Sequence, residues 1–538
     1  MRRDLNLLAD QIFNLLVIGG GITGAAIARD ASLRGLSVAL IERNDFAHAT
    51  SAHNSKLIHG GLRYLRNFEF SLVRESLRER RTWLRIAPHL VRPLPFLLPL
   101  LDSGLRARAA LSAGLTLYDL LSFDRGGLDD PAQFLPRHDW FDARKALACE
   151  PCLGSLPLAG AFRYFDAQMY SPERLTLECV LDASQNGATP ANHLEALTLL
   201  LRKDGVEGAK VRDLESNAEF DVRARLTIVA VGPWADVFLA KALGRPMHTL
   251  RRSKGIHLIV PPLTRSHALT MAAERGHFFV LPWRNSALIG TTDTAFEGNP
   301  DIVGASEAEI EDFLGLVNKH LPAARIGRRD VRHAYAALRP LVADSGGSTY
   351  SASRRAELID HRSENGVGAL LSVIGGKWTT SRALAQQTVD AALRKLRKSA
   401  GACTTARRRL PGGAIDRVSD LVTSARAACA TFPNADHLAR LYGSRLPKLL
   451  AILEERPNLS RPLGSSGDLG AQVVLAIREE MALTLEDVVM RRTGIGQEGN
   501  PGPEVLDKTA VIMAEELGWS ETRMRAEIAS VAAIFGGT

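Results

Sequence analysis

The first strongly patterned stretch is a short, wholly apolar run at 15–18, as expected of a buried parallel strand. Residues 22–34 are small and apolar enough to pack as a helix, and Gly35 stands where a helix often ends. A second apolar strand covers 38–41 and ends at Glu42. The order of strand, helix and strand predicts a parallel βαβ unit.

Further along the chain, the hydrophobic pattern changes from mixed α and β to β-rich, and then to helical. An amphipathic helix is predicted over 68–86, and residues 160–230 return to alternating α and β patterns. The stretch 250–295 is β-rich, and Ser306 caps a predicted helix that runs to His320. From residue 416 to 538 the pattern is almost wholly helical, which predicts a separate helical domain.

The apolar region 94–121 allows two interpretations. Three prolines forbid a continuous helix up to residue 99, and Arg92, Arg106 and Arg108 flank the apolar residues. The region is therefore a candidate for lying in a membrane surface, and buried core is an equally good interpretation.

Composition and charge narrow the class of protein. The 538 residues suggest two to four domains, and their 46% hydrophobic and 23% charged residues are typical of a globular protein. No window approaches 18 apolar residues in a row, and a cleaved signal would remove the first strand, so we expect neither a membrane span nor a signal. The net charge of +8 fits an anionic substrate or membrane surface. No nucleic-acid-binding module is recognisable.

The cysteines indicate a reducing compartment. There are five, an odd and sparse set for a long chain. Cys149 and Cys152 have C-x-x-C spacing, but no second pair and no thioredoxin-like context accompany them. We therefore predict no metal site and no redox disulfide.

Residues 19–24 carry the pattern G-x-G-x-x-G. Gly19 permits the tight turn out of the strand, Gly21 lets a pyrophosphate approach the backbone, and Gly24 lets the helix lie close to the sheet. The helix N-terminus then offers free N–H groups to the anion. Glu42 can accept hydrogen bonds from ribose hydroxyls. This combination predicts a dinucleotide site rather than a purely structural turn, without distinguishing FAD from NAD.

Polar residues follow at three places that we expect to lie near the cofactor. The stretch 49–64 carries hydroxyls, amides, two histidines and a double glycine, and it comes directly after the ribose-binding acid; an ordinary polar loop is the alternative. The apolar strand 225–231 ends in Gly232-Pro-Trp234. The strand 370–374 ends in a double glycine, a lysine and a helix start that can stabilise negative charge.

Nine stretches together resemble the FAD-dependent glycerol-3-phosphate dehydrogenase family. They are VIGGGITGAAIARDASLRGLSVALIE, SKLIHGGLRYL, VGPWA, SKGIHLIV, IGTTDT, ALRPL, SVIGGKWTT, LPGGAI and MRRTGIG, between residues 17 and 496. The second and the seventh are far more specific than G-x-G-x-x-G. Their order and spacing extend the resemblance over nearly the whole chain.

The resemblance implies an α/β fold with a glutathione-reductase-like FAD-binding Rossmann domain, a β-sheet substrate domain and a C-terminal all-helical domain. It implies FAD-binding segments at about 12–90, 160–250 and 335–400, substrate-domain segments at about 91–159 and 251–334, and a helical domain at 401–538. The implied reaction is oxidation of sn-glycerol 3-phosphate to dihydroxyacetone phosphate by hydride transfer to flavin N5, with membrane quinone as the final acceptor. The implied location is cytoplasmic, peripherally attached to the inner face of the cell membrane. A homodimer is left open.

Family positions also imply a basic substrate pocket. A phosphomonoester carries nearly two negative charges and favours bidentate arginines. Arg354 and Lys377 are expected at the phosphate, and Tyr64 can add a hydroxyl donor. Arg63 and Arg339 are expected nearer the reacting carbon, where both belong to the predicted catalytic group.

His257 is the candidate proton acceptor, because imidazole titrates near neutral pH; a purely structural histidine is the alternative. Arg339 could share the work by depressing the pKa of the substrate hydroxyl. His59 is expected to pack against the flavin. The predicted cofactor-binding residues are Gly19, Gly21, Ile22, Thr23, Gly24, Glu42, Arg43, Thr50, Ser51, Ser55, Lys56, Leu57, His59, Gly60, Gly61, Gly232, Trp234, Asp293, Gly376, Lys377, Trp378 and Thr379.

Three places depart from the family pattern. Ala52 replaces a hydroxyl residue, Ile256 replaces a small polar residue beside the histidine, and 170–175 differs from the usual acidic stretch. The first two lie in the flavin and substrate neighbourhoods, so another polyol phosphate, such as a tetritol phosphate, is an alternative substrate. An oxidase that reduces O₂ and a flavin-binding protein without turnover are further alternatives. The intact basic cluster argues against the last.

Overall fold

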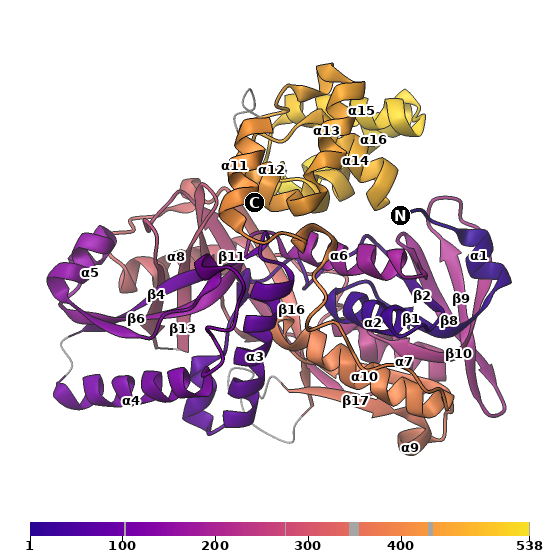
Figure 1. Ribbon diagram of the computed structural model, residues 1–538, viewed down its shortest axis with the longest axis horizontal. Helices are drawn as coiled ribbons and strands as arrows, with labels where there is room; N and C mark the ends of the chain where they lie inside the picture. The colour runs from indigo at the N-terminus through magenta and orange to yellow at the C-terminus, as the bar shows by residue number, and fades with distance from the viewer. Residues whose placement is uncertain (102–103, 275, 344–354, 429–433, 537–538) are drawn as a thin grey trace.

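The computed structural model describes residues 1–101, 104–274, 276–343, 355–428 and 434–536. Two sheets lie side by side, and a helical domain, orange to yellow in Figure 1, covers them at one end. Within the described residues, no helix is long and apolar enough to cross a membrane.

The first sheet has eight strands and a parallel centre in the order β18-β10-β1-β2-β7. The predicted βαβ unit is confirmed, because β1 and β2 pair in parallel with Leu15 opposite Val38. The strands of this sheet are β1 (Ile12–Ile18), β2 (Val38–Ile41), β7 (Ala188–Ala191), β8 (Leu194–Arg202), β9 (Gly205–Asp213), β10 (Glu219–Val229), β17 (Ala356–Asp360) and β18 (Leu370–Gly375).

Helices cover one face of this sheet, and an antiparallel ribbon packs on the other. The apolar side chains of α2 (Ile22–Leu33), α6 (Pro172–Gln185) and α10 (Ser381–Leu396) form one core with β1 and β2. On the opposite face, β8 and β9 pack with α1 (Leu5–Asp10) and α7 (Ala235–Leu243). A short helix, α9 (His361–Asn365), follows β17. The central strands are therefore buried on both faces, as their continuous apolar runs predict.

The second sheet has ten strands and is mostly antiparallel. Its strands are β3 (Leu57–Ile58), β4 (Val91–Leu101), β5 (Asp139–Asp142), β6 (Leu158–Met169), β11 (Leu250–Val260), β12 (Ala268–Ala273), β13 (Gly276–Trp283), β14 (Ser286–Gly290), β15 (Thr294–Ala295) and β16 (His333–Val342). Residues 160–169 and 335–342, which the sequence places in predicted FAD-binding segments, lie in this sheet, because β6 pairs along β4 and β16 along β11.

The apolar region 94–121 divides between core and surface. Residues 91–101 form β4, so the buried-core interpretation holds for them. Pro93 and Pro99 are tolerated there because they lie outside the short stretch, Phe96–Leu97, over which β4 pairs with β12. Residues 105–121 form the helix α4 (Leu105–Leu121), which lies along the lower edge of Figure 1 with most of its residues at the surface.

Helices also flank the second sheet. On one face α5 (Ala143–Cys149) and α8 (Glu307–His320) complete its core. The Ser306 cap of α8 is confirmed, with a reciprocal bond to Glu309. On the other face lies α3 (Phe70–Ile86), the predicted amphipathic helix, together with α4. This second face turns towards the first sheet.

The C-terminal domain has its own apolar core of helices, as predicted. The helices are α11 (Val418–Ala428), α12 (Ala435–Tyr442), α13 (Leu446–Glu455), α14 (Gly470–Glu480), α15 (Pro503–Leu517) and α16 (Glu521–Gly536). A π-helix at Asp487–Arg492 follows the capping box of Thr484 and Asp487.

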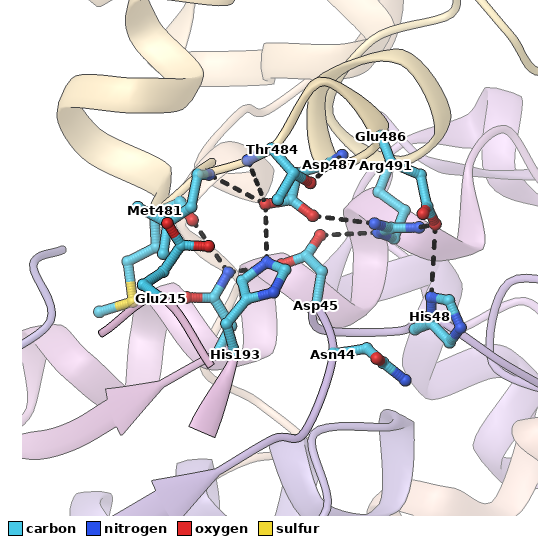
Figure 2. Close-up of polar contacts among 12 residues, drawn as sticks. Asn44, Asp45, His48, His193, Glu215, Met481, Thr484, Glu486, Asp487 and Arg491 are labelled. Atoms are coloured by element: carbon cyan, nitrogen blue, oxygen red, sulfur yellow. Dashed lines mark hydrogen bonds and ion pairs between the residues drawn. The ribbon is translucent and has the colours of Figure 1, made fainter. Parts of the chain in front are cut away.

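Charged residues join this domain to the first sheet. Asp45 accepts hydrogen bonds from Arg491 Nε at 2.7 Å and from two nitrogens of Arg492 at 2.6 and 2.8 Å. His193 Nε2 lies 2.9 Å from the carboxylate of Asp487 (Figure 2). All five side chains are buried or nearly so. We call these five residues the domain junction.

Candidate active site

A cavity of about 1010 Å³ lies where the carboxyl ends of β1, β2, β10 and β18 face the second sheet. Most residues that the sequence predicts for the site line this cavity. They are Gly19, Gly21, Ile22, Thr23, Glu42, Arg43, Thr50, Ser51, Ser55, Leu57, His59, Gly61, Arg63, Tyr64, Gly232, Trp234, Asp293, Arg339, Gly376, Lys377, Trp378 and Thr379.

The glycine loop opens onto the cavity at the N-terminus of α2. Gly21 is the N-cap, and Ile22 N donates to Ser51 Oγ at 2.9 Å. Gly24 does not line the cavity, because it packs the helix against the strand: an added Cβ would lie 1.9 Å from the carbonyl oxygen of Gly19. The loop therefore has the close packing and the exposed helix N-terminus that a pyrophosphate needs.

Backbone groups hold Glu42, the acid that the sequence predicts to bind ribose. Glu42 accepts hydrogen bonds from Gly20 N at 2.6 Å and from Asn44 N at 2.9 Å. These bonds fix its carboxylate at the end of β2, where it lines the cavity. The geometry fits the predicted adenosine end of the dinucleotide.

The adenosine end has a bridge that the sequence did not reveal. One oxygen of Asp301 accepts bonds from Arg43 at 2.7 Å and from Trp234 Nε1 at 2.8 Å. Asp301 lies in the loop before α8, far from both partners in sequence, and it also lines the cavity. No sequence pattern distinguishes this aspartate from other loop acids.

The stretch 49–64 runs along the cavity wall, as predicted, but Lys56 points away from it. Its ammonium donates to Glu173 and to the carbonyl of Ala52, both at 2.7 Å, and the side chain is buried. Further on, His59 N donates to Thr379 Oγ1 at 3.2 Å. Burial, Lys377 and Arg63 hold the pKa of His59 well below its usual value, so the ring is neutral.

The basic groups of the predicted substrate pocket converge on the cavity. Arg339 donates to Ser253 Oγ at 3.0 Å and to Thr291 Oγ1 at 2.7 Å. The Arg63 guanidinium and the Lys377 ammonium lie 4.9 and 4.8 Å from the ring centre of Tyr64. Arg354 lies outside the described residues.

Lys377 is unusual among these cations. Its Nζ is buried and has no hydrogen-bond partner among the described residues. Burial, with a further contribution from Arg63, lowers the pKa of Lys377 to about 7. Because a buried ammonium without a partner is costly, this group fits an anionic ligand in the cavity.

His257 does not line the cavity. The ring is 3% exposed, stacks on Tyr335 and lies directly behind Gly290, where an added Cβ would meet the ring at 2.1 Å. Its Nε2 reaches Ser55 Oγ at 2.8 Å, and Ser55 does line the cavity. Burial and Arg339 hold the pKa of His257 well below its usual value, so the ring is neutral.

Gly60 also lies behind the cavity wall. Its N–H donates to Asp166 Oδ1 at 3.1 Å, and an added Cβ would lie 2.2 Å from the hydroxyl of Tyr118. Asp166 is a lining residue that sequence reasoning missed. A lone acid inside the apolar strand β6 was the only signal that could have indicated it.

The glycine cradle, the acid at the strand end and the unpartnered ammonium fit a bound dinucleotide beside an anionic substrate. This fold and site define a dinucleotide-dependent oxidoreductase. Residues 14–382 match the family described as FAD dependent oxidoreductase, and residues 403–524 match the C-terminal domain of alpha-glycerophosphate oxidase. The chain belongs to the FAD-dependent glycerol-3-phosphate dehydrogenase family, and the predicted cofactor, FAD, is confirmed.

Individual relatives support the same assignment. A glycerol-3-phosphate dehydrogenase from Synechocystis is 37% identical over 98% of this chain and 97% of its own length. The mitochondrial glycerol-3-phosphate dehydrogenase of Mesocricetus auratus is 33% identical over 97% of this chain and 73% of its own length. The structure of glycerol-3-phosphate dehydrogenase from Bacillus halodurans complexed with FAD is 26% identical, with a TM-score of 0.79 over 99% of this chain and 96% of that one.

Proposed function

We propose that this chain oxidises sn-glycerol 3-phosphate to dihydroxyacetone phosphate. The observation that carries the proposal is the convergence of Arg63, Arg339 and Lys377 on one cavity beside the FAD-binding loop. The names of its relatives support the same substrate. When bound, FAD supplies the acceptor for the hydride that leaves the secondary alcohol carbon.

The basic residues of the cavity have different proposed roles. Lys377 binds the phosphate dianion, and Arg354 is proposed as a further phosphate ligand. Arg63, whose guanidinium lies 4.9 Å from the ring centre of Tyr64, is proposed nearer the reacting carbon, together with Arg339. Arg339 is held by Ser253 and Thr291, which fixes its guanidinium at the cavity wall. There it stabilises negative charge as the substrate hydroxyl loses its proton.

The proton leaves through Ser55. Because His257 lies behind the wall, it takes the proton through the hydroxyl of Ser55 and not directly from the substrate. A neutral ring with a low pKa offers Nε2 as an acceptor. His257 therefore keeps its predicted role as proton acceptor in this proposal, with Ser55 as the relay.

Membrane quinone is the proposed final acceptor, with the chain attached peripherally at the inner face of the cell membrane. The residues that line the cavity include apolar Phe96, Leu98 and Phe279, and also Leu111 of α4. Outside, α4 and its end expose Leu105, Leu120 and Phe123, which are 84%, 66% and 76% exposed. A helix that contributes Leu111 to the cavity and exposes other apolar side chains outside suits an acceptor that arrives from lipid. A homodimer stays open.

Anaerobic reduction tests the reaction. The FAD-loaded protein is mixed with sn-glycerol 3-phosphate in the absence of oxygen, and the visible absorbance of the flavin is followed. We expect rapid bleaching, restored by a quinone analogue. Bleaching only with a tetritol phosphate would replace the substrate, and rapid reoxidation by O₂ with peroxide formation would replace the acceptor. A flavin that no polyol phosphate bleaches would overturn the proposal.

Flotation tests the membrane contact separately. Leu105→Glu together with Leu120→Glu places charge on the exposed face of α4 without touching its buried residues. We expect the wild-type protein to float with anionic vesicles and the double variant to stay in the soluble fraction. Equal flotation of both would remove α4 as the contact.

A further inference from the structure

A buried polar bridge connects α4 to the wall of the active site. Asp166 stands at its centre: its carboxylate accepts from Tyr118 Oη at 2.8 Å and from Gly60 N at 3.1 Å. Arg80 neutralises the same carboxylate and also donates to Ser122 Oγ, just after the end of α4, at 2.9 Å. We call Tyr118, Asp166 and Gly60 the α4 bridge.

Tyr118 is the polar anchor of a helix that is otherwise at the surface. Over Leu105–Leu121, all of which the structure describes, only Leu115 and Tyr118 are buried. Burial, together with Asp166, raises the pKa of Tyr118 well above its usual value, so its hydroxyl keeps the proton that it donates. A shift of α4 therefore moves a hydrogen-bond donor of Asp166.

Gly60 places the substrate residues. The Tyr118 hydroxyl touches the position where a side chain of Gly60 would begin, 2.2 Å away, and Thr379 bonds His59 one residue earlier. The chain then turns through Gly61, at φ +77°, into Arg63 and Tyr64. The placement of Arg63 and Tyr64 thus depends on a backbone clamped from both sides.

We propose that Tyr118 and Asp166 are positioning residues: they couple the seating of α4 on a membrane to the placement of Arg63 and Tyr64, and so set the affinity for the substrate. The proposal rests on the proposed function of the cavity and of α4. The proposal adds a structural connection through which membrane binding by α4 changes the substrate affinity of a cavity that lipid does not contact.

The test compares two Tyr→Phe substitutions, each of which removes one buried hydroxyl. Tyr118→Phe removes the donor to Asp166 and keeps the ring, whereas Tyr442→Phe removes a hydroxyl that is equally buried in the C-terminal domain. For both variants and the wild type, kcat and KM are measured with a water-soluble electron acceptor, with and without phosphatidylglycerol vesicles. FAD affinity, thermal midpoint and vesicle flotation are measured in parallel.

For Tyr118→Phe without vesicles, we expect KM for glycerol 3-phosphate to rise about tenfold with little change in kcat or FAD affinity. Vesicles should lower the wild-type KM about fivefold. They should leave Tyr118→Phe unchanged although it floats equally well. Tyr442→Phe should behave as the wild type.

Three other results overturn the proposal. A wild-type KM and a full vesicle response in Tyr118→Phe would show that the bridge carries no coupling. Equal losses in KM, FAD affinity and thermal midpoint would show a merely structural role. A wild-type KM that vesicles do not change would remove the coupling to the membrane. A wild-type protein that does not oxidise glycerol 3-phosphate would instead refute the proposed function.

Discussion

The domain junction and the active-site cavity are both rich in charge, but their charges are arranged in opposite ways. At the junction, buried Asp45 accepts hydrogen bonds from Arg491, and His193 lies within hydrogen-bond distance of Asp487 (Figure 2). Asp45 also accepts hydrogen bonds from Arg492. In the cavity, the Lys377 ammonium is buried with no hydrogen-bond partner among the described residues.

The difference separates structure from function. A buried charge with a complete set of partners holds two parts of the chain together, and removing one partner leaves the other uncompensated. A buried charge without a partner lowers stability and persists where a ligand supplies the missing partner. Variants at the domain junction should therefore lower stability, whereas variants at Lys377 should lower activity.

The largest effect is expected from Asp45→Asn, because it removes the carboxylate that pairs with buried Arg492 and one of the three carboxylates around buried Arg491. We expect the free energy of unfolding to fall by about 3–5 kcal/mol, with kcat/KM of the folded protein nearly unchanged. Denaturant unfolding measures the first quantity. Asp436→Asn, which breaks the exposed pair with Arg426, should cost under about 1 kcal/mol. If Asp45→Asn instead lowered kcat/KM and left the free energy of unfolding unchanged, the contrast between the domain junction and the cavity would be wrong.

Lys377→Met should produce the converse result. We expect kcat/KM for glycerol 3-phosphate to fall about 100- to 1000-fold, because a phosphate cation is lost, while the thermal midpoint stays or rises. Steady-state kinetics on FAD-loaded protein, with calorimetry alongside, measure both. Lys395→Met is the matched control, because Lys395 of α10 pairs with Asp360 and neither residue lines the cavity. Strong destabilisation by Lys377→Met would contradict this assignment.

A pH series sharpens the assignment of Lys377, whose pKa lies at about 7. Binding of the phosphate dianion favours the ammonium and raises its pKa in the complex. Affinity is therefore greatest below pH 7 and is lost as the pH rises towards the raised value, by up to about tenfold per pH unit. KM measured across this range should rise accordingly, and Lys377→Arg, always charged, should flatten it. An equally steep profile in Lys377→Arg would point to another group.

The smallest effect is expected at His193. Burial lowers the pKa of its ring, but the Asp487 carboxylate outweighs burial and raises the pKa above 6.5. This contact therefore contributes fully below pH 6.5, and its contribution is lost as the pH rises through the raised value. Unfolding free energies should show a loss of about 1 kcal/mol over that window, absent in His193→Gln. A profile unchanged by the substitution would exclude His193.

Much of the fold followed from local pattern. The βαβ unit and its glycine loop were predictable because strand, turn and helix lie within thirty residues of one another, from Asn14 to Glu42. The convergence of Arg63, Arg339 and Lys377 was predicted from family positions, and the structure brings all three to one cavity. Their individual roles stay predictions.

Side-chain direction was not predictable. Lys56 stands in the right stretch, but Glu173, 117 residues away, draws its ammonium into the core. The His257 ring occupies the space left by the missing side chain of Gly290 on the paired strand and stacks on Tyr335, so it does not line the cavity. Asp166 and Asp301 act through partners that are distant in sequence. Each case depends on long-range contacts that no local pattern encodes.

The N-terminal βα unit also has a consequence for synthesis of the chain. The central strand β1 pairs with β10, at residues 219–229, and Arg29 of α2 donates to Asp182 at 2.6 Å and to the carbonyl of Arg408 at 2.7 Å. A nascent chain must therefore emerge from the ribosome to beyond residue 408 before α2 acquires its final partners, and to residue 492 before Asp45 does. We expect the N-terminal βα unit to stay incompletely folded for most of translation and to depend on chaperones during that time.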